Sequence, residues 1–263
     1  MVLDIEFMMK SILPIASKAW LTIYMSLVSM VFATLLAALF AYFIMKKVPI
    51  LSGVAKVWNS FIKGIPIIIQ LYVVYYTLPN VLYDISMKWG LNYDVKNQSA
   101  IKYAIIALSL NYASYMTDVV ISSLKAVDAG QLEACWSVGM TTVQAYRRVI
   151  IPQAFVVGLP NAGNQFVALM KATSMAYFIT VMEVLGKAKQ LAAGTYKFFE
   201  AYILAAVVYW VLCIISEKLL AIWEAKIQIN RKATVETKSV NVEEKKHDGN
   251  FKKNGSNTEF CDT

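Results

Sequence analysis

The chain has 263 residues, of which 58% are hydrophobic and 16% are charged, and its mean hydropathy is +0.53. This composition excludes a typical water-soluble domain and indicates an integral membrane protein. The formal net charge of +8 does not indicate a nucleic-acid partner, because the sequence contains no basic, aromatic-rich soluble domain. We interpret the charge as Lys and Arg residues that flank membrane spans and contact lipid.

Long uncharged runs predict about five transmembrane helices. Each run reaches, or with a neighbouring turn can reach, the roughly 20 residues that cross a ~30 Å hydrocarbon core. The expected spans are Trp20–Met45, Ile65–Tyr83, Tyr103–Thr117, Val149–Met170 and Ala201–Ser216. A further uncharged run, Ala172–Met182, is too short to span and is interpreted as a short or re-entrant piece. The predicted fold class is therefore an all-α integral membrane protein.

The segment between the third and fourth spans predicts two short helices. Asp128 with Gln131, and Thr141 with Gln144, each fit a helix N-cap with a reciprocal partner three residues later. Gly139 lies between the two pairs, where a helix commonly ends in a residue with positive φ. Pro152 is then expected to begin the fourth span.

This segment carries a specific resemblance. Glu133-Ala134-Cys135, then Gly139, Val149 and Ile151-Pro152 are similar in spacing to the EAA signature of ATP-binding-cassette (ABC) importer permeases. The resemblance implies that residues 125–151 form a cytosolic coupling loop that docks on a separate ATPase subunit. It assigns Glu133, Ala134, Gly139, Val149 and Pro152 to ATPase coupling. The alternative is an interfacial turn with two capped helices and no partner.

Further motifs resemble the polar amino acid subfamily, whose members handle histidine, glutamine, glutamate, arginine, opines or cystine. They are Lys63-Gly64-Ile65-Pro66, Asn111 with Tyr115 and Asp118, and Gly163-Asn164-Gln165-Phe166 with Lys171, Thr173 and Ser174. The resemblance covers roughly Ala19–Trp223 and implies a type I importer architecture. It places residues 1–19 outside the cell, the permease domain at 20–223 and a cytosolic tail at 224–263. Because that tail is polar and mixed in charge, it is predicted to be disordered.

Polar residues near the middle of the spans predict the substrate path. Gln70, Asn111 and Asn161 lie ~12–18 Å into their spans at 1.5 Å per residue, where a polar side chain that faces lipid is costly. They either bind substrate or hydrogen-bond a neighbouring helix. Asp118 lies nearer the cytosolic side and either gates the path, binds an amine or is a water-facing structural acid. The full set expected on the path is Gln70, Asn111, Tyr115, Asp118, Asn161, Asn164, Gln165, Lys171 and Ser174.

Glycine and proline predict helix breaks in two spans. Gly64 with Pro66, and Pro160 with Gly163, interrupt the helical pattern and free backbone groups that need a wet cavity. The alternative is a kink that helix packing tolerates.

No enzyme is indicated. Gly186-Lys187 is followed by Ala188 and has no upstream glycine of a phosphate-binding loop, so ATP is expected on a partner subunit and no cofactor on this chain. His247 is in the tail, far from any nucleophile, and Cys135, Cys213 and Cys261 show no disulfide or metal spacing.

The function expected is the transmembrane permease of an ATP-driven ABC importer that works by alternating access. The implied partners are an ABC ATPase, a second permease chain, identical or related, and an extracytoplasmic amino-acid-binding protein or lipoprotein. Ala172 stands where the family often has an acid, and Ile121 with Ser122-Ser123 replaces a commonly basic turn, so a neutral or zwitterionic solute such as cystine or glutamine is favoured. The alternative is a secondary amino-acid transporter driven by an ion gradient.

Overall fold

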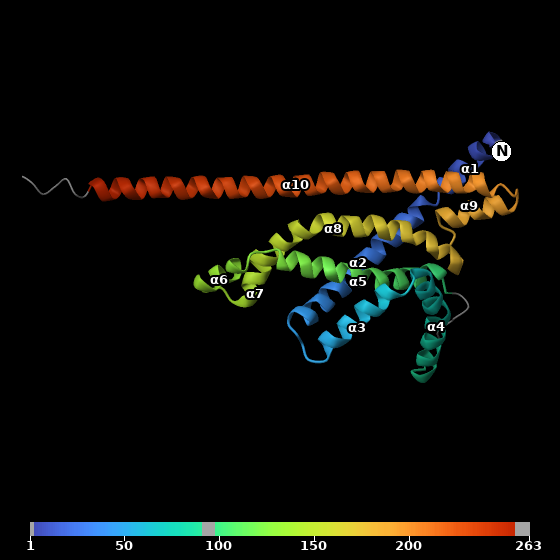
Figure 1. Ribbon diagram of the computed structural model, residues 1–263, viewed down its shortest axis with the longest axis horizontal. Helices are drawn as coiled ribbons and strands as arrows, with labels where there is room; N and C mark the ends of the chain where they lie inside the picture. The colour runs from blue at the N-terminus through green and yellow to red at the C-terminus, as the bar shows by residue number, and fades with distance from the viewer. Residues whose placement is uncertain (1–2, 91–97, 256–263) are drawn as a thin grey trace, which may run out of the picture. The chain divides into compact units, whose positions relative to one another are not determined.

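The computed structural model describes residues 3–90 and 98–255, with side chains as far as residue 227. Within these ranges every regular element is a helix (Figure 1), which confirms the predicted all-α class. The elements are α1 (Ile5–Ala16), α2 (Ala19–Met45), α3 (Leu51–Gly64), α4 (Ile67–Lys88), α5 (Ala100–Lys125), α6 (Ala129–Ser137), α7 (Thr142–Ala145), the π-helix η1 (Tyr146–Ile150), α8 (Ile151–Ala172), the 3-10 helix η2 (Thr173–Ile179), α9 (Val184–Ala193) and α10 (Phe198–Gly255). The chain divides into two compact units, Met1–Leu220 and Ala221–Thr263.

Three stretches of helix are long and apolar enough to cross a membrane: Ile5–Met45, Ala100–Lys125 and Phe198–Ile227. Two bent helix pairs raise the number to five if each counts as one span. Those pairs are α3 with α4, bent by 110°, and Thr142–Ile179 with α9, bent by 44°. Each of the five predicted spans falls within one of these five segments, so the prediction of about five spans agrees with the larger of the two counts.

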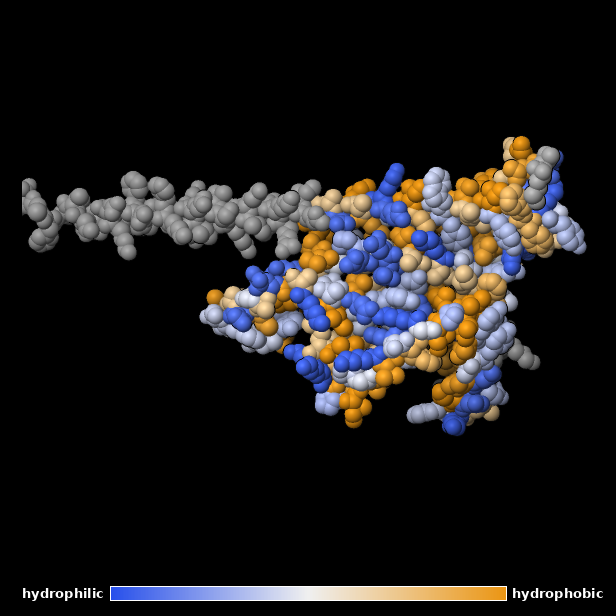
Figure 2. All heavy atoms as spheres, viewed as in Figure 1, coloured by the Kyte–Doolittle hydropathy of each residue, from blue (hydrophilic) through white to orange (hydrophobic). Residues whose placement is uncertain are grey.

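Large apolar side chains cover much of the surface of the first unit. Leu27, Val31, Phe32 and Leu35 of α2 are each more than half exposed, and Figure 2 shows hydrophobic residues among hydrophilic ones over the face in view. Proteins that are surrounded by water rarely expose so much apolar surface, whereas lipid tails solvate such a surface. The surface therefore agrees with a chain that passes through the membrane several times.

Helix α5 is the centre of the first unit. It packs against α2, α3, α4, α8 and η2, and in Figure 1 it lies between α8 and α3. Ala104, Ala107 and Ala113 on α5 are almost completely buried, as are Ala33 and Ala37 on α2. Small side chains let two helix backbones approach closely, which is the main source of helix association in lipid.

Helices α5 and α8 approach each other closely at Gly158. A Cβ atom at Gly158 would lie 2.3 Å from Ser123 Oγ and 3.0 Å from Ser123 Cβ, so any larger residue requires Ser123 to shift. At Gly163 a Cβ atom would lie 3.2 Å from a methyl carbon of Leu220. These glycines serve helix packing, and the predicted break is wrong: α8 is continuous through Pro160 and Gly163.

Helix α8 is not separated from the second short helix by a loop. Its N-terminal end is joined to α7 by η1, where the amide of Ile151 bonds the carbonyl of Tyr146, five residues before it. Pro152 has no amide hydrogen and its ring crowds the carbonyl four residues earlier, so a widened turn is the local solution. The helix consequently runs without a loop from the second short helix into the fourth span.

The N-terminal segment contains the helix α1, which packs against α9 and α10. Ile15 of α1 is fully buried in a cluster with Val184 and Ala188 of α9 and Ala201 of α10. Most of this segment is thus the helix α1, which continues into α2 as one 41-residue apolar stretch. The location of residues 1–19 outside the cell stays a prediction.

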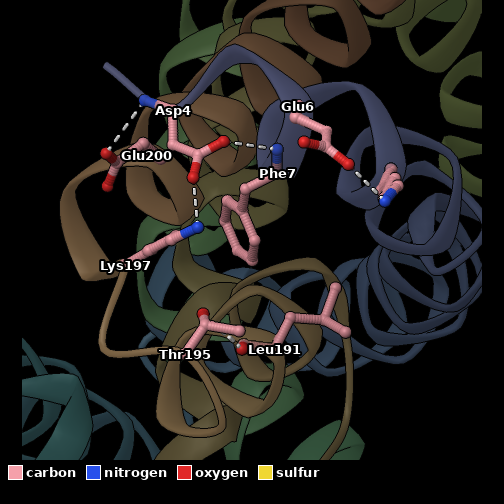
Figure 3. Close-up of polar contacts among 8 residues, drawn as sticks. Asp4, Glu6, Phe7, Leu191, Thr195, Lys197 and Glu200 are labelled. Atoms are coloured by element: carbon pink, nitrogen blue, oxygen red, sulfur yellow. Dashed lines mark hydrogen bonds and ion pairs between the residues drawn. The ribbon is translucent and has the colours of Figure 1, made fainter. Parts of the chain in front are cut away.

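An ionic contact connects the start of α1 to the start of α10 (Figure 3). The Lys197 ammonium pairs with the Asp4 carboxylate, which also accepts the Phe7 amide at 2.8 Å and so caps α1. The hydrogen bond from Lys197, followed by the bond from Phe7, lowers the pKa of Asp4. The Asp4 amide in turn donates to Glu200 at 3.4 Å. The start of α1 is therefore tied to the start of α10.

The C-terminal tail differs from the prediction of disorder. In the second unit the backbone is helical as far as Gly255, and residues 256–263 lie outside the described range. Between Glu224 and Gly255 the sequence has no proline and many Lys and Glu residues, which favour helix.

Replacement of Gly158 by Ala should destabilise the protein by about 1–3 kcal/mol, because the added methyl group overlaps Ser123 in a tight helix contact. The midpoint of thermal unfolding in detergent measures the loss. Gly53→Ala is the matched control, because a Cβ atom at Gly53 meets nothing within 4 Å. Equal stability of the two variants would contradict the close α5–α8 contact.

Candidate functional site: a capped two-helix segment and a hydrogen-bonded elbow

The segment of residues 125–151, here the coupling segment, contains the two predicted short helices. Asp128 caps α6 by accepting the amide of Gly130 at 2.6 Å. The second cap has the full predicted form: Gln144 N donates to Thr141 Oγ1 at 3.3 Å, and Thr141 N donates to Gln144 Oε1 at 2.9 Å. Each helix start is therefore defined by its own side chains.

One detail of the first cap was predicted incorrectly. The Gln131 side chain does not return to the amide of Asp128; its Oε1 instead accepts from Gln153 Nε2 at 3.5 Å. Gln153 belongs to α8, so this contact ties the first short helix to the start of the fourth span. A contact between residues 22 positions apart cannot be read from local spacing.

Gly139 adopts the predicted conformation between α6 and α7. Its φ is +81°, a value that residues with a Cβ adopt only at a cost of about 1–2 kcal/mol. The turn exposes Glu133 and Ala134 on α6, together with Trp136 and Val138, which are 48% and 73% exposed. Cys135 beside them is buried. Val149 lies half-buried in η1, and Pro152 is exposed at the start of α8.

A sharp bend, here the elbow, joins α3 to α4 and confirms the predicted break at Gly64 and Pro66. Helix α3 ends at Gly64, Ile65 is extended with φ −111° and ψ 132°, and Pro66 precedes α4. Such a bend removes hydrogen bonds from the last carbonyls of α3, which is costly inside a membrane.

The side chain of Gln70 replaces the missing bonds. Its Nε2 donates to the carbonyls of Ile62 and Ile65, both at 2.8 Å. Its Oε1 accepts from Asn111 Nδ2 on α5 at 3.1 Å, and both Gln70 and Asn111 are buried. The side-chain amides of these two residues thus form hydrogen bonds between helices, which is the alternative to substrate binding that their position in the spans left open. Direct contact with substrate stays a prediction for them.

A charged pair lies two turns further along α5. Lys63, the last-but-one residue of α3, pairs with Asp118, and its Nζ lies 5.8 Å from the centre of the Tyr115 ring. Asn111, Tyr115 and Asp118 follow one another at the four- and three-residue spacings that share one helix face. The predicted residues of α5 and Gln70 of α4 are therefore brought together at the elbow. Lys63 was part of the sequence motif but had no predicted role.

The remaining path residues lie on α8 and η2. Asn161, Asn164 and Lys171 are exposed, and Gln165 is half-buried. Ser174 Oγ bonds the carbonyl of Lys171 at 2.8 Å, so it satisfies the end of α8. No hydrogen bond or ion pair described for these α8 and η2 residues reaches the elbow.

One buried acid was missed by the sequence reasoning. Glu183 is fully buried and accepts the amides of Leu185 and Gly186 at 2.9 Å and the hydroxyl of Tyr209. It caps α9 and ties it to α10. Glutamate followed by an apolar helical pattern was the available signal, but the Tyr209 partner is distant in sequence.

The helices, the bends and the coupling segment describe a multi-pass membrane protein of the transporter type. Residues 7–229 match the family described as binding-protein-dependent transport system inner membrane component, and the chain belongs to this family. It is accordingly a cell-membrane transport component and not an enzyme, as predicted.

The match to named relatives extends over most of both chains. The chain is 39% identical to the probable amino-acid permease protein YxeN of Bacillus subtilis, over 84% of this chain and 95% of the relative. It is 29% identical to the L-cystine transport system permease protein TcyL of the same organism, over 84% of this chain and 90% of the relative. A crystal structure of an amino acid ABC transporter with histidines is similar with a TM-score of 0.72 and 29% identity, covering 86% of this chain and 100% of that chain. The predicted permease fold is thereby confirmed.

Replacement of Gln70 by Met should cost about 1–3 kcal/mol, because the carbonyls of Ile62 and Ile65 and the Asn111 amide each lose a hydrogen bond to Gln70 in a buried site. The unfolding midpoint in detergent is the measurement. Asn161→Ala, an exposed amide on α8, should leave that midpoint almost unchanged. A Gln70→Met variant as stable as the wild type would show that the elbow does not need this amide.

Proposed function

We propose that this chain is the permease subunit of an ATP-driven ABC importer for a polar amino acid. Family membership supports transport, and the exposed coupling segment supports an external motor. The single observation that carries the proposal is the pair of capped short helices around Gly139, which presents Glu133 on a surface where its own chain does not cover it.

The proposed mechanism is alternating access imposed from outside the chain. Two permease chains, identical or closely related, line one path, and each rests its coupling segment on one ATPase subunit, which alone binds ATP. Closure of the ATPases moves the two segments together and turns the path outward toward an extracytoplasmic binding protein or lipoprotein. The permease changes conformation because its coupling segment makes different contacts with the ATP-bound and ATP-free states of the ATPase, and this difference shifts the equilibrium between its two conformations. Continuity of α7, η1 and α8 supports this route, since a helix without a loop transmits displacement into the fourth span.

For the substrate, we propose a neutral or zwitterionic amino acid, with cystine or glutamine favoured. The likeness to permeases named for amino acids, one of them for L-cystine, supports the class. Ala172, which cannot pair with a cationic side chain, supports the exclusion of strongly basic substrates.

Glu133→Lys should abolish ATP-dependent uptake of the amino acid in proteoliposomes while the protein remains inserted, because it reverses the charge presented to the motor. Asp84→Lys, which reverses another exposed acid at the end of α4, should leave uptake near the wild-type rate. If Glu133→Lys transports normally, the coupling segment is only a turn.

Gly139→Val should also lose uptake, whereas Gly139→Asn should retain most of it. A β-branched residue is strained at φ +81°, and asparagine tolerates this region. Co-purification of the ATPase subunit with each variant separates loss of docking from loss of transport. Full activity of the Val variant would refute a conformational role for this turn.

A further inference from the structure

The Lys63–Asp118 pair lies inside the membrane span and faces away from its own core. Asp118 is about 8 Å from the midpoint of α5 toward its C-terminal end, at 1.5 Å per residue, whereas half of a ~30 Å hydrocarbon core is ~15 Å. The Asp118 side chain is nevertheless 67% exposed. A charge at this depth is costly against lipid and is found facing a polar cavity or path. Figure 2 shows hydrophilic residues gathered in the middle of the first unit, over α8, α5 and α3.

The elbow fixes where the two charged groups stand. Gln70 bonds the carbonyls of Ile62 and Ile65 on either side of Lys63 and is itself bonded to Asn111. The backbone that carries Lys63 is thus attached to the helix that carries Asp118, about 10 Å along α5 from Asn111. The lysine stem remains flexible, so its ammonium can move a few ångströms while its anchor does not.

The chemistry of the pair matches the main chain of an amino acid. A substrate zwitterion carries a carboxylate and an ammonium on one carbon, which are complementary in sign to the Lys63 ammonium and the Asp118 carboxylate. We propose that Lys63 and Asp118 are the main-chain recognition site of the path: Lys63 binds the α-carboxylate and Asp118 the α-ammonium of the passing amino acid. This inference rests on the proposed function and names residues for it.

The exchange conserves charge at every stage. Without substrate the two side chains neutralise each other; with substrate, two ion pairs replace one and the net charge of the site stays zero. No group is left as an isolated charge inside the membrane, which would be the costly state. The Tyr115 ring beside Lys63 stabilises the ammonium while it changes partners. The site reads nothing of the substrate side chain, so it suits any amino acid that the rest of the path admits.

The test uses the complete complex of permease and ATPase subunit in nanodiscs, without a binding protein, so that only the path selects. Binding of L-glutamine is compared with that of L-glutaminamide, which lacks the carboxylate, and of glutaramic acid, which lacks the ammonium; L-cystine serves as the second probe. Lys63→Met should weaken amino-acid binding about tenfold or more and remove the preference for L-glutamine over its amide. Asp118→Asn should remove the preference over glutaramic acid. Lys56→Met, an exposed lysine on the same helix, is the control.

The outcomes separate the two proposals. ATP-driven uptake by the wild type in proteoliposomes tests the function, and its absence for every amino acid tried would overturn the function and this inference together. If the wild type imports while Lys63→Met and Asp118→Asn bind all three compounds like the Lys56→Met control, only the recognition site is overturned. It is equally overturned if both variants weaken all three compounds by the same factor, because the pair would then only hold α3 to α5.

Discussion

A bilayer offers no water to the backbone, and the elbow between α3 and α4 is organised around this constraint. A bend of 110° in the middle of a membrane unit exposes carbonyl groups that must find donors. Gln70 supplies them from within the next helix, and Asn111 orients its amide from α5. The same contacts attach the end of α3, which carries Lys63, to α5, which carries Tyr115 and Asp118.

Packing around α5 explains how one helix can support so many neighbours. Its buried positions include three alanines and three serines, and it packs against α2, α3, α4 and α8. Gly158 extends the same rule to α8, where even a methyl group would overlap Ser123. In lipid, apolar side chains gain little free energy by associating with one another. Specific helix contacts therefore depend on close packing of this kind.

The conformation of the coupling segment depends on local sequence, and not on packing between distant helices. Its helix starts are defined by Asp128, Thr141 and Gln144, and its turn by a glycine with positive φ. It packs little of its surface into the rest of the chain and instead exposes Trp136 and Val138. The segment is thus exposed and continuous with α8 through η1, and these are the two features on which its proposed coupling role rests.

The sequence by itself determined the features that depend on composition and short spacing. Apolar length predicted the membrane spans, the Thr141–Gln144 spacing predicted a capping box, and Gly139 and Pro66 marked the turn and the elbow, because each is governed by neighbouring backbone. The tertiary structure alone decided which polar groups meet. Gln70 with Asn111, Lys63 with Asp118 and Glu183 with Tyr209 come from different helices, and the same Gly-Pro pattern that breaks the chain at Pro66 leaves α8 continuous at Pro160. Helix periodicity predicts on which face of its own helix a residue lies, but not which helix packs against that face. The neighbouring helix decides whether a side-chain amide is used in a hydrogen bond between helices or remains exposed.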